Sequence, residues 1–453
     1  MRIAFLLHSF PAVSETFILG QITGLLDLGH DVHIYAQRRP PNGESGPIHS
    51  DFHSYQLASR TTYLDSEMPE ESGYWSMPVW PFSGETWLPG AERPISNSAR
   101  LMRAVPVLRR CLDAAPQLTL EVVDPDQYGP QAVSLEALYH LSSFLDRPPE
   151  YDVLHAHFGP VANEFRFARA VWKTPLVVTF HGYDFSVVPR LHGSDVYSRL
   201  FRDADAVMGI SEYAIQKLRQ IGCPAQKLSV LHTGVCLAKV PFRARRLQAG
   251  EPVRILTVGR LVEKKGLEYA LRAVATVRCK HPSIRYEIIG EGPLRPALES
   301  LIGQLDLGSV VTLRGAMKAE MVHRTFAESH LYILASVTAA DGDQEGIPVS
   351  LMEAQACGLP VLSTRHSGIP ELVADGGSGF LVDERNADEL ADRLLYLIEN
   401  PRQWPAMGER GRKIIEAQFD IDALNRDLLR LYDGAISRFR SSSPAMTRGC
   451  DRV

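Results

Sequence analysis

Residues 345–356 read Glu-Gly-Ile-Pro-Val-Ser-Leu-Met-Glu-Ala-Gln-Ala and mark the junction of a loop with a helix. Pro348 suits the first position of that helix, because a proline there gives up no hydrogen bond, and Gly358 suits the residue just past its end. Glu345 then lies in the loop facing the free N–H groups, and Glu353 projects from the helix about one and a half turns further on. Such a helix start suits an anion, and the carboxylates on either side can accept hydrogen bonds from hydroxyl groups. A core helix with one solvated glutamate is the alternative, and the rest of the chain must decide.

The segments around this junction alternate between short apolar runs and helical patterns. In the second half of the chain we expect strands at 255–258, 286–289, 310–313, 332–334, 361–363 and 380–382, with helices beginning near residues 267, 294, 318, 348 and 387. In the first half we expect strands at 3–7, 32–35, 153–155, 176–180, 206–210 and 228–231, with a helix at 211–221 capped by Ser211. Repeated βα alternation predicts mostly parallel sheets with helices on both faces and ligands at the carboxyl ends of the strands.

We therefore predict an α/β fold of two doubly wound, Rossmann-like domains that face each other across a cleft. The first covers 1–245, with an insertion at about 40–150, and the second covers 246–415. A helical segment at 416–440 returns to the first domain, and residues 441–453 form a disordered tail. The opening βαβ unit lacks the G-x-G-x-x-G fingerprint, so NAD is not its favoured ligand.

Composition narrows the class of protein. The chain has 453 residues, 45% of them hydrophobic and 22% charged, which fits a soluble protein too long for one core. A formal charge of −5 without a long basic block argues against a nucleic-acid partner. The six cysteines lie far apart and fit reduced thiols in a cytoplasmic protein. The N-terminal apolar run is too short for a signal peptide, and no stretch approaches the roughly 18 apolar residues that cross a bilayer.

Loops at three strand ends of the second half carry phosphate-binding residue types. The loop 259–266 reads Gly-Arg-Leu-Val-Glu-Lys-Lys-Gly and precedes a helix. Arg260 and Lys265, beside free N–H groups at that helix start, suit a diphosphate clamp, and a solvated charged turn is the alternative. The segment 290–294 has glycines that let the backbone approach a ring or a phosphate, and the turn 368–371 lies at the same edge of the sheet. Their convergence predicts a site for a ligand with phosphates and hydroxyl groups.

His181 is the candidate from the first half. It follows the strand at 176–180, which puts it on the floor of the cleft opposite the phosphate loops. A lone histidine is more often structural than catalytic, but this position favours a function. His155 and His157 point to one face of their strand, and we interpret them as structural. No D-x-D pair lies beside a strand end of the second half, so we predict no metal site.

Motifs from both halves together resemble the retaining glycosyltransferases of family 4, which have the GT-B fold. These motifs are residues 259–266, the pair Glu345 and Glu353, the turn 368–371, and His181 with Gly182. The resemblance covers most of the chain except about 40–150 and the tail. Residues 337–348 and 10–17 look closest to the bacterial exopolysaccharide branch, the colanic-acid type.

The resemblance implies a retaining, metal-independent transfer of a sugar from a nucleotide-diphosphate sugar, with UDP favoured and no further cofactor, to a saccharide or lipid-linked acceptor. It implies that Arg260 and Lys265 hold the diphosphate and assist catalysis. The implied donor site comprises Arg260, Lys265, Glu291, Gly292, Leu294, Glu345, Gly346, Ile347, Pro348 and Glu353, with Glu345 on the sugar hydroxyls, Glu353 on the ribose, and His181 near the reacting carbon.

Two departures from the family pattern are informative. The Gly-Gly loop common after the first strand is replaced here, which makes Phe10, Ser14 and Glu15 the acceptor-side candidates. The usual Gly-Val-Asp is Gly-Val-Cys at 234–236, near the connection between the domains.

Two mechanisms and two rival functions stay open at this stage. A retaining enzyme uses either a carboxylate nucleophile or same-face attack by the acceptor within an ion pair. We favour same-face attack, because Glu345 lies beside a glycine in a loop suited to hydroxyl binding, with no second acid placed to donate a proton. The rival functions are a non-hydrolysing sugar-nucleotide epimerase and a non-catalytic two-lobed ligand-binding protein. A third, a catalytically dead scaffold, is disfavoured by the intact set of Arg260, Lys265, Glu345 and Glu353.

The insertion is a candidate surface for peripheral contact with the inner face of the cytoplasmic membrane. Its aromatic residues Tyr74, Trp75, Trp80, Phe82 and Trp87 cluster among prolines, and Arg103, Arg109 and Arg110 follow on a helical stretch. Aromatic rings favour the membrane interface and basic residues the anionic leaflet. Packing of the aromatics onto the first domain is the alternative.

Overall fold

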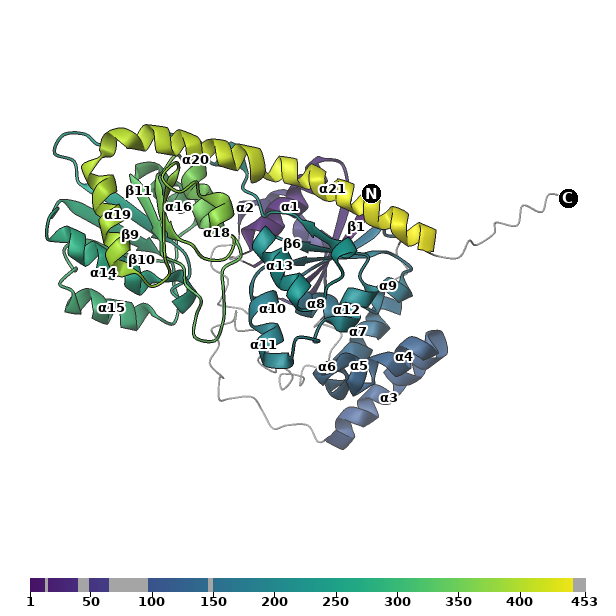
Figure 1. Ribbon diagram of the computed structural model, residues 1–453. Coiled ribbons are helices and arrows are strands. Elements are labelled where there is room, and N and C mark those ends of the chain that lie inside the picture. Colours follow the sequence, from purple (N-terminus) through teal and green to yellow (C-terminus); the bar gives the residue numbers. More distant parts are fainter. Residues whose placement is uncertain (13–14, 40–48, 65–96, 146–149, 443–453) are drawn as a thin grey trace.

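The protein consists of two α/β domains, each built on one parallel sheet (Figure 1). The computed structural model describes residues 1–12, 15–39, 49–64, 97–145 and 150–442. The strand order is β3-β2-β1-β4-β5-β6-β7 in the first sheet and β10-β9-β8-β11-β12-β13 in the second. In each sheet, successive strands are added first on one side of a central strand and then on its other side. This order confirms the predicted doubly wound fold class.

Every strand expected from the sequence is present. The first sheet has β1 Arg2–Ser9, β2 Asp31–Arg38, β3 Thr61–Tyr63, β4 Val153–His157, β5 Leu176–Phe180, β6 Ala206–Gly209 and β7 Leu228–Val230. The second has β8 Val253–Val258, β9 Ile284–Ile289, β10 Val311–Gly315, β11 Leu331–Leu334, β12 Val361–Thr364 and β13 Gly379–Val382. Strands β4, β5, β11 and β12 are buried along their whole length, because helices cover both faces of each sheet. Only β3 was not predicted, since it is a three-residue, half-buried edge strand.

The helices of the first domain include a cluster formed by the insertion. They are α1 Thr16–Asp27, α2 Ser50–Ser54, α3 Asn97–Ala114, α4 Pro116–Val122, α5 Pro125–Tyr128, α6 Pro130–Ser134, α7 Glu136–Leu145, α8 Gly159–Glu164, α9 Ala168–Val171, α10 Tyr183–Ser186, α11 Val188–His192, α12 Ser198–Asp203 and α13 Glu212–Gln220. Helices α3 to α7 lie together beside the first sheet (Figure 1). Phe144 of α7 stacks on Trp172 at 4.4 Å between ring centroids, which packs this cluster onto the domain.

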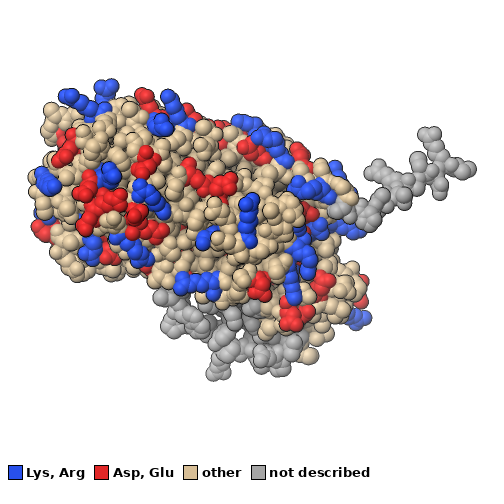
Figure 2. Space-filling view, in the orientation of Figure 1, with Lys and Arg blue, Asp and Glu red and all other residues tan. Residues whose placement is uncertain are grey.

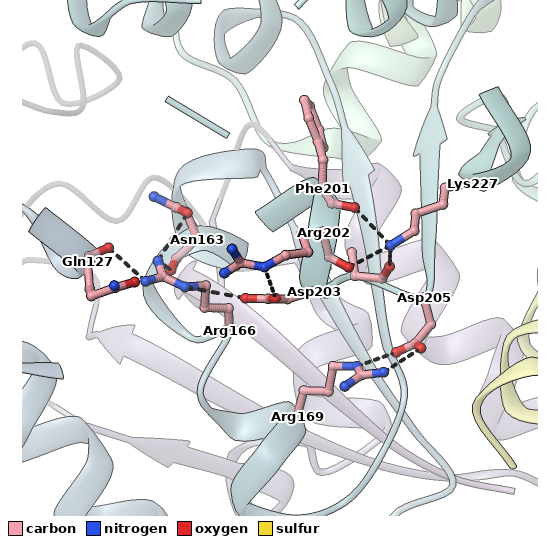
Figure 3. A network of polar contacts seen from close by, with 10 residues as sticks. Gln127, Asn163, Arg166, Arg169, Phe201, Arg202, Asp203, Asp205 and Lys227 are labelled. Atoms are coloured by element: carbon pink, nitrogen blue, oxygen red, sulfur yellow. Dashed lines mark hydrogen bonds and ion pairs between the residues drawn. The ribbon is translucent and has the colours of Figure 1, made fainter. Parts of the chain in front are cut away.

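A polar network joins the insertion to the edge of the first sheet (Figure 3). The buried guanidinium of Arg166 donates to the carbonyl of Gln127 at 2.7 Å and lies 3.6 Å from the Asp203 carboxylate. The Lys227 ammonium donates to three carbonyls at the end of α12, within 2.8 Å of each. These contacts satisfy the free carbonyls of α12 and hold α5 against it.

The second domain continues into two long helices. Its helices are α14 Leu267–Arg278, α15 Arg295–Gln304, α16 Ala319–Glu328, α17 Val349–Ala356, α18 Ile369–Leu372, α19 Ala387–Glu399, α20 Trp404–Gln418 and α21 Ile421–Ser442. At the junction at residues 345–356, Pro348 is the cap of α17 rather than its first residue, and Gly358 follows its end with a φ of +86°. That left-handed conformation favours glycine.

Helix α21 runs from the second domain along the first (Figure 1). Its buried Tyr432 hydroxyl lies 2.6 Å from Nδ1 of His155, and a Cβ added to Gly24 of α1 would collide with Asn425. These contacts support the assignment of 416–440 as a segment that returns to the first domain. None of the described helices combines the length and apolar character needed to cross a membrane. On the face drawn in Figure 2, acidic and basic side chains are interspersed over both domains.

Candidate active site

Lys265 and Glu345, predicted from separate loops, form an ion pair within the second domain. Lys265 Nζ lies 2.9 Å from Glu345 Oε1, and the two side chains are 13% and 9% exposed. The Lys265 side chain crosses Gly259, whose added Cβ would lie 3.2 Å from its Cε, so the glycine makes room for it. Burial acts to raise the pKa of Glu345, but Lys265 and Lys264 hold it at about 2. The carboxylate is therefore ionised at neutral pH.

A second ion pair lies beside the first and was not predicted. Lys264 Nζ lies 2.8 Å from Asp343 Oδ2, and Lys264 is buried. Two adjacent lysines of the loop after β8 therefore meet two acids of the loop before α17. Burial raises the pKa of Asp343, and Lys264 opposes that shift.

His366 and Glu384 fix the backbone at Glu345. The Glu345 N–H donates to Nε2 of His366 at 3.1 Å, and Nδ1 of His366 lies 2.6 Å from the Glu384 carboxylate. Because Nε2 accepts, Nδ1 carries the proton and donates to Glu384. The sequence signal for His366 was its place just after β12, two residues before a turn that had been singled out.

The loops after β8 and β9 are joined by their backbones. The Leu261 N–H donates to the carbonyl of Glu291 at 2.8 Å, and the Leu294 N–H donates to the carbonyl of Leu261 at 3.0 Å. A Cβ on Gly292 would lie 2.6 Å from the Leu261 carbonyl oxygen, so this approach needs a glycine. Arg260 is thereby held next to residues 290–294. The Glu291 carboxylate itself is engaged by Arg295 at 2.8 Å.

Glu353 on α17 and Ile347 just before this helix have different surroundings. The Glu353 carboxylate lies 3.7 Å from Nε2 of His323 on α16 and raises the pKa of that imidazole. Ile347 is 5% exposed and packs in the core, so that only its backbone is placed to meet a ligand.

His181 belongs to a cluster of buried histidines at the carboxyl ends of β4 and β5. Its Nε2 lies 2.9 Å from Nδ1 of His157, and its backbone N–H donates to the Asp184 carboxylate at 2.9 Å. Burial holds the pKa of His181 well below its ordinary value and lowers that of His157 to about 3, so both rings are neutral. His157, interpreted as structural, is thus a direct partner of His181, whereas His155 bonds to Thr179 and Tyr432.

Two buried ring atoms of this cluster, Nδ1 of His181 and Nε2 of His157, make no hydrogen bond to a described residue. Buried polar atoms are nearly always paired, so an orphaned one indicates a place for a ligand group.

The His181 loop and the Glu345 loop meet where the two domains touch. A Cβ added to Gly346 would lie 2.1 Å from the carbonyl oxygen of His181, and one on Gly182 would lie 3.0 Å from the carbonyl oxygen of Gln344. Only glycines allow the backbones of the two domains to approach so closely. The structure therefore brings His181 and Glu345 onto facing loops.

The acceptor-side candidates differ in what the structure shows of them. Phe10 is 3% exposed and packs in the core 5.8 Å from the ring of Phe52, and its contact with an acceptor stays a prediction. Ser14 lies outside the described residues. Glu15 directly precedes α1, and burial raises its pKa to about 7, with the charge of Arg260 opposing that shift.

Among the described residues, one group could hold a metal ion. Glu136 and His140 of α7 and Glu164 of α8 offer ligand atoms that lie within 4.8 Å of one another. His140 Nδ1 and Glu164 Oε1 are 2.9 Å apart and form a buried ion pair. The group belongs to the first domain and shares no residue with the lysine pairs.

Two doubly wound domains that meet at a cationic, carboxylate-bearing loop edge have the layout of the GT-B fold, and comparisons with known proteins give the family. Residues 241–414 match the family "Glycosyl transferases group 1", and residues 14–234 match "Glycosyl transferase 4-like domain". The chain belongs to glycosyltransferase family 4, whose members are retaining and metal-independent.

Relatives match over the full length. The chain is 34% identical to WcaL of Escherichia coli K12, named for colanic acid biosynthesis, over 95% of this chain and 99% of WcaL. It is 34% identical to the amylovoran biosynthesis glycosyltransferase AmsK of Erwinia amylovora, over 96% of this chain and 99% of AmsK. Among solved structures, Anabaena HepE in complex with UDP has a TM-score of 0.65 and 17% identity, over 96% of this chain and 100% of HepE.

Proposed function

We propose that the protein transfers a sugar from a nucleotide-diphosphate sugar, with UDP favoured, to a saccharide or lipid-linked acceptor in the synthesis of an exopolysaccharide. The observation that carries the proposal is the buried Lys265–Glu345 pair on a loop in close backbone contact with the His181 loop, where Nδ1 of His181 makes no hydrogen bond to a described residue. The nucleotide is suggested by HepE, which has been solved with UDP and with UDP-glucose. The product class is suggested by the names of WcaL and AmsK.

The main electrostatic requirement of the reaction is to stabilise the negative charge on the leaving diphosphate. As the bond between the anomeric carbon and the diphosphate oxygen breaks, negative charge grows on the diphosphate. Arg260, Lys265 and the free N–H groups at the start of α17 stabilise that charge without a metal. Lys265 then exchanges part of its contact with Glu345 for the diphosphate, and Glu345 turns to the sugar hydroxyls. Glu353, about one turn into the same helix, binds the ribose.

The sugar is held from the first domain. Nδ1 of His181 offers its unused hydrogen-bonding position to a sugar hydroxyl near the reacting carbon. The acceptor oxygen attacks on the face from which the diphosphate leaves, its proton passes to the departing diphosphate oxygen, and the configuration is retained. Glu15, just before α1 of the first domain, is the acidic group that we assign to the acceptor side.

Nucleotide binding and sugar transfer are tested in two steps. A thermal-shift panel of nucleoside diphosphates should give the largest shift with UDP, since a ligand at 100 times its Kd stabilises by about 2.7 kcal/mol. Product analysis should then show sugar transfer that requires an acceptor, persists in EDTA and retains the anomeric configuration.

The same assays separate the rival functions. Conversion of the donor without an acceptor would favour the epimerase, and binding without any conversion would favour the non-catalytic two-lobed protein. An inverted linkage would contradict same-face attack.

A further inference from the structure

Helix α13 begins where the domains meet, and its first turn is capped from both of them. Within the first domain, the Ser211 hydroxyl accepts from the N–H of Ala214 at 3.0 Å, as predicted. The N–H groups of Glu212 and Tyr213 instead donate to the carboxylate of Glu371, at 3.0 and 3.2 Å. Glu371 belongs to α18 of the second domain. A helix start in one domain is therefore completed by a carboxylate from the other.

The surroundings of Glu371 favour its charged form. His232 of the first domain places Nε2 3.2 Å from the same carboxylate. Burial acts to raise the pKa of Glu371, but His232 and the two N–H groups lower it overall. An ionised carboxylate at a helix N-terminus forms charge-assisted hydrogen bonds and also meets the positive end of the helix dipole.

The same turn of α13 reaches the donor loop. The Tyr213 hydroxyl donates to the side-chain oxygen of Gln344 at 2.9 Å, and Gln344 directly precedes Glu345. A Cβ added to Gly368 would lie 2.9 Å from Cβ of Ser211, so the 368–371 turn and α13 are in close contact. The contact of Glu371 with α13 and the contact of Gly346 with His181 thus belong to the same interface between the two domains.

We propose that Glu371 is a positioning residue that sets the register between the two domains and so holds Glu345 opposite His181. Its bonds to α13 exist only when the domains are in contact. When they separate, the carboxylate and the two N–H groups return to water, so the cap stabilises the closed arrangement relative to the open one. The inference rests on the proposed function, because the closed arrangement is the one that assembles the donor site against the first domain.

Kinetics of Glu371 variants test this role. Glu371→Ala should lower kcat for transfer about 10- to 100-fold, the size expected for two charge-assisted hydrogen bonds made in the closed state. The Kd for UDP should change less than threefold, because the proposed nucleotide contacts lie in the second domain. Glu371→Gln should recover part of kcat, since its amide oxygen still accepts from α13. Glu328→Gln, on the exposed end of α16, is the matched control and should behave as wild type.

A distance measurement tests the cap without relying on activity. Spin labels at the exposed positions 173 and 280, one on each domain, report the interdomain distance. In ligand-free protein, Glu371→Ala should shift the distribution to longer distances, and Glu371→Gln should shift it less. A Glu371→Ala protein with the wild-type distribution and wild-type kcat would overturn the inference. Failure of wild type to bind any nucleoside diphosphate would instead refute the proposed function, and the ligand-free distances would still decide on the cap.

Discussion

Replacement of Lys265 by alanine should impair both stability and transfer. The pKa of Glu345 is about 2 against an ordinary 4.5, so its surroundings favour the ionised form by about 3 kcal/mol, at about 1.4 kcal/mol per pKa unit. The pKa of Lys265 is lowered, because burial outweighs the attraction of Glu345. The intact pair therefore adds less net stability than Glu345 alone suggests. Removing one partner is the costly change, because it leaves a buried, unpaired carboxylate.

We expect Lys265→Ala to lower the free energy of unfolding by about 3 kcal/mol at pH 7, measured by denaturant unfolding at a temperature where the variant is folded. The stability that Glu345 contributes is present above pH 4.5 and lost as the pH falls toward about 2, so the difference between the two proteins should shrink in acid. The double variant Lys265→Met with Glu345→Gln should regain most of the stability, because no unpaired charge remains. Transfer by Lys265→Ala should fall about 10²–10³-fold.

The stability and transfer measurements test the buried ion pair and the diphosphate contact separately. A Lys265→Ala protein as stable as wild type would refute the buried pair. Transfer within threefold of wild type, in a folded variant, would refute the diphosphate contact. A double variant that is stable but inactive would show that the charges serve the reaction rather than the fold.

Three further predictions concern other parts of the molecule. Glu353→Ala should raise the donor KM more than it lowers kcat, because a ribose contact is present in the ground and transition states alike, and steady-state kinetics that show the reverse would indicate a chemical role. Burial and the charge of Glu164 raise the pKa of Glu136 to about 7, so wild-type stability should fall as the pH rises from about 4.5 to about 7. Glu136→Gln should therefore raise the melting temperature more at pH 8 than at pH 5. Equal shifts of the melting temperature at both pH values would contradict this prediction. On α3, Met102 and Val105 are 73% and 55% exposed beside the exposed Arg103, Arg109 and Arg110. Replacing these three arginines by serine should weaken sedimentation of the protein with anionic vesicles and slow transfer to a lipid-linked acceptor. No change in either measurement would show that this surface is structural.

Only the basic part of the predicted membrane surface lies within the described residues. The aromatic residues at 74–87 lie outside the described residues, so only the basic part of the predicted surface is located in the fold. Helix α3 has the exposed apolar and basic side chains that such a surface needs. The vesicle assay therefore addresses α3 alone.

The sequence by itself determined the order of the strands and helices and the loops that carry the site. Buried parallel strands are continuous apolar runs, and glycines, prolines and helix caps mark their ends, so these signals are local and can be read without a structure. Ser211 capped its helix as predicted, Arg260 and Lys265 lie in the loop after β8, and Glu345 lies in the loop before α17. The edge strand β3 was missed because three half-buried residues carry no periodic signal.

Tertiary structure alone decided which of these residues meet. The pairing of Lys265 with Glu345, the support of Glu345 by His366, and the capping of α13 by Glu371 all join segments far apart in the chain. Such contacts depend on strand order and on how the domains meet, which the local pattern of one chain does not encode. The position of Phe10 likewise depended on the tertiary structure: its side chain is buried in the core of the first domain. The alternation of apolar and polar residues specifies the elements, whereas the packing of those elements creates the low-dielectric cluster in which paired charges and neutral histidines acquire their chemistry.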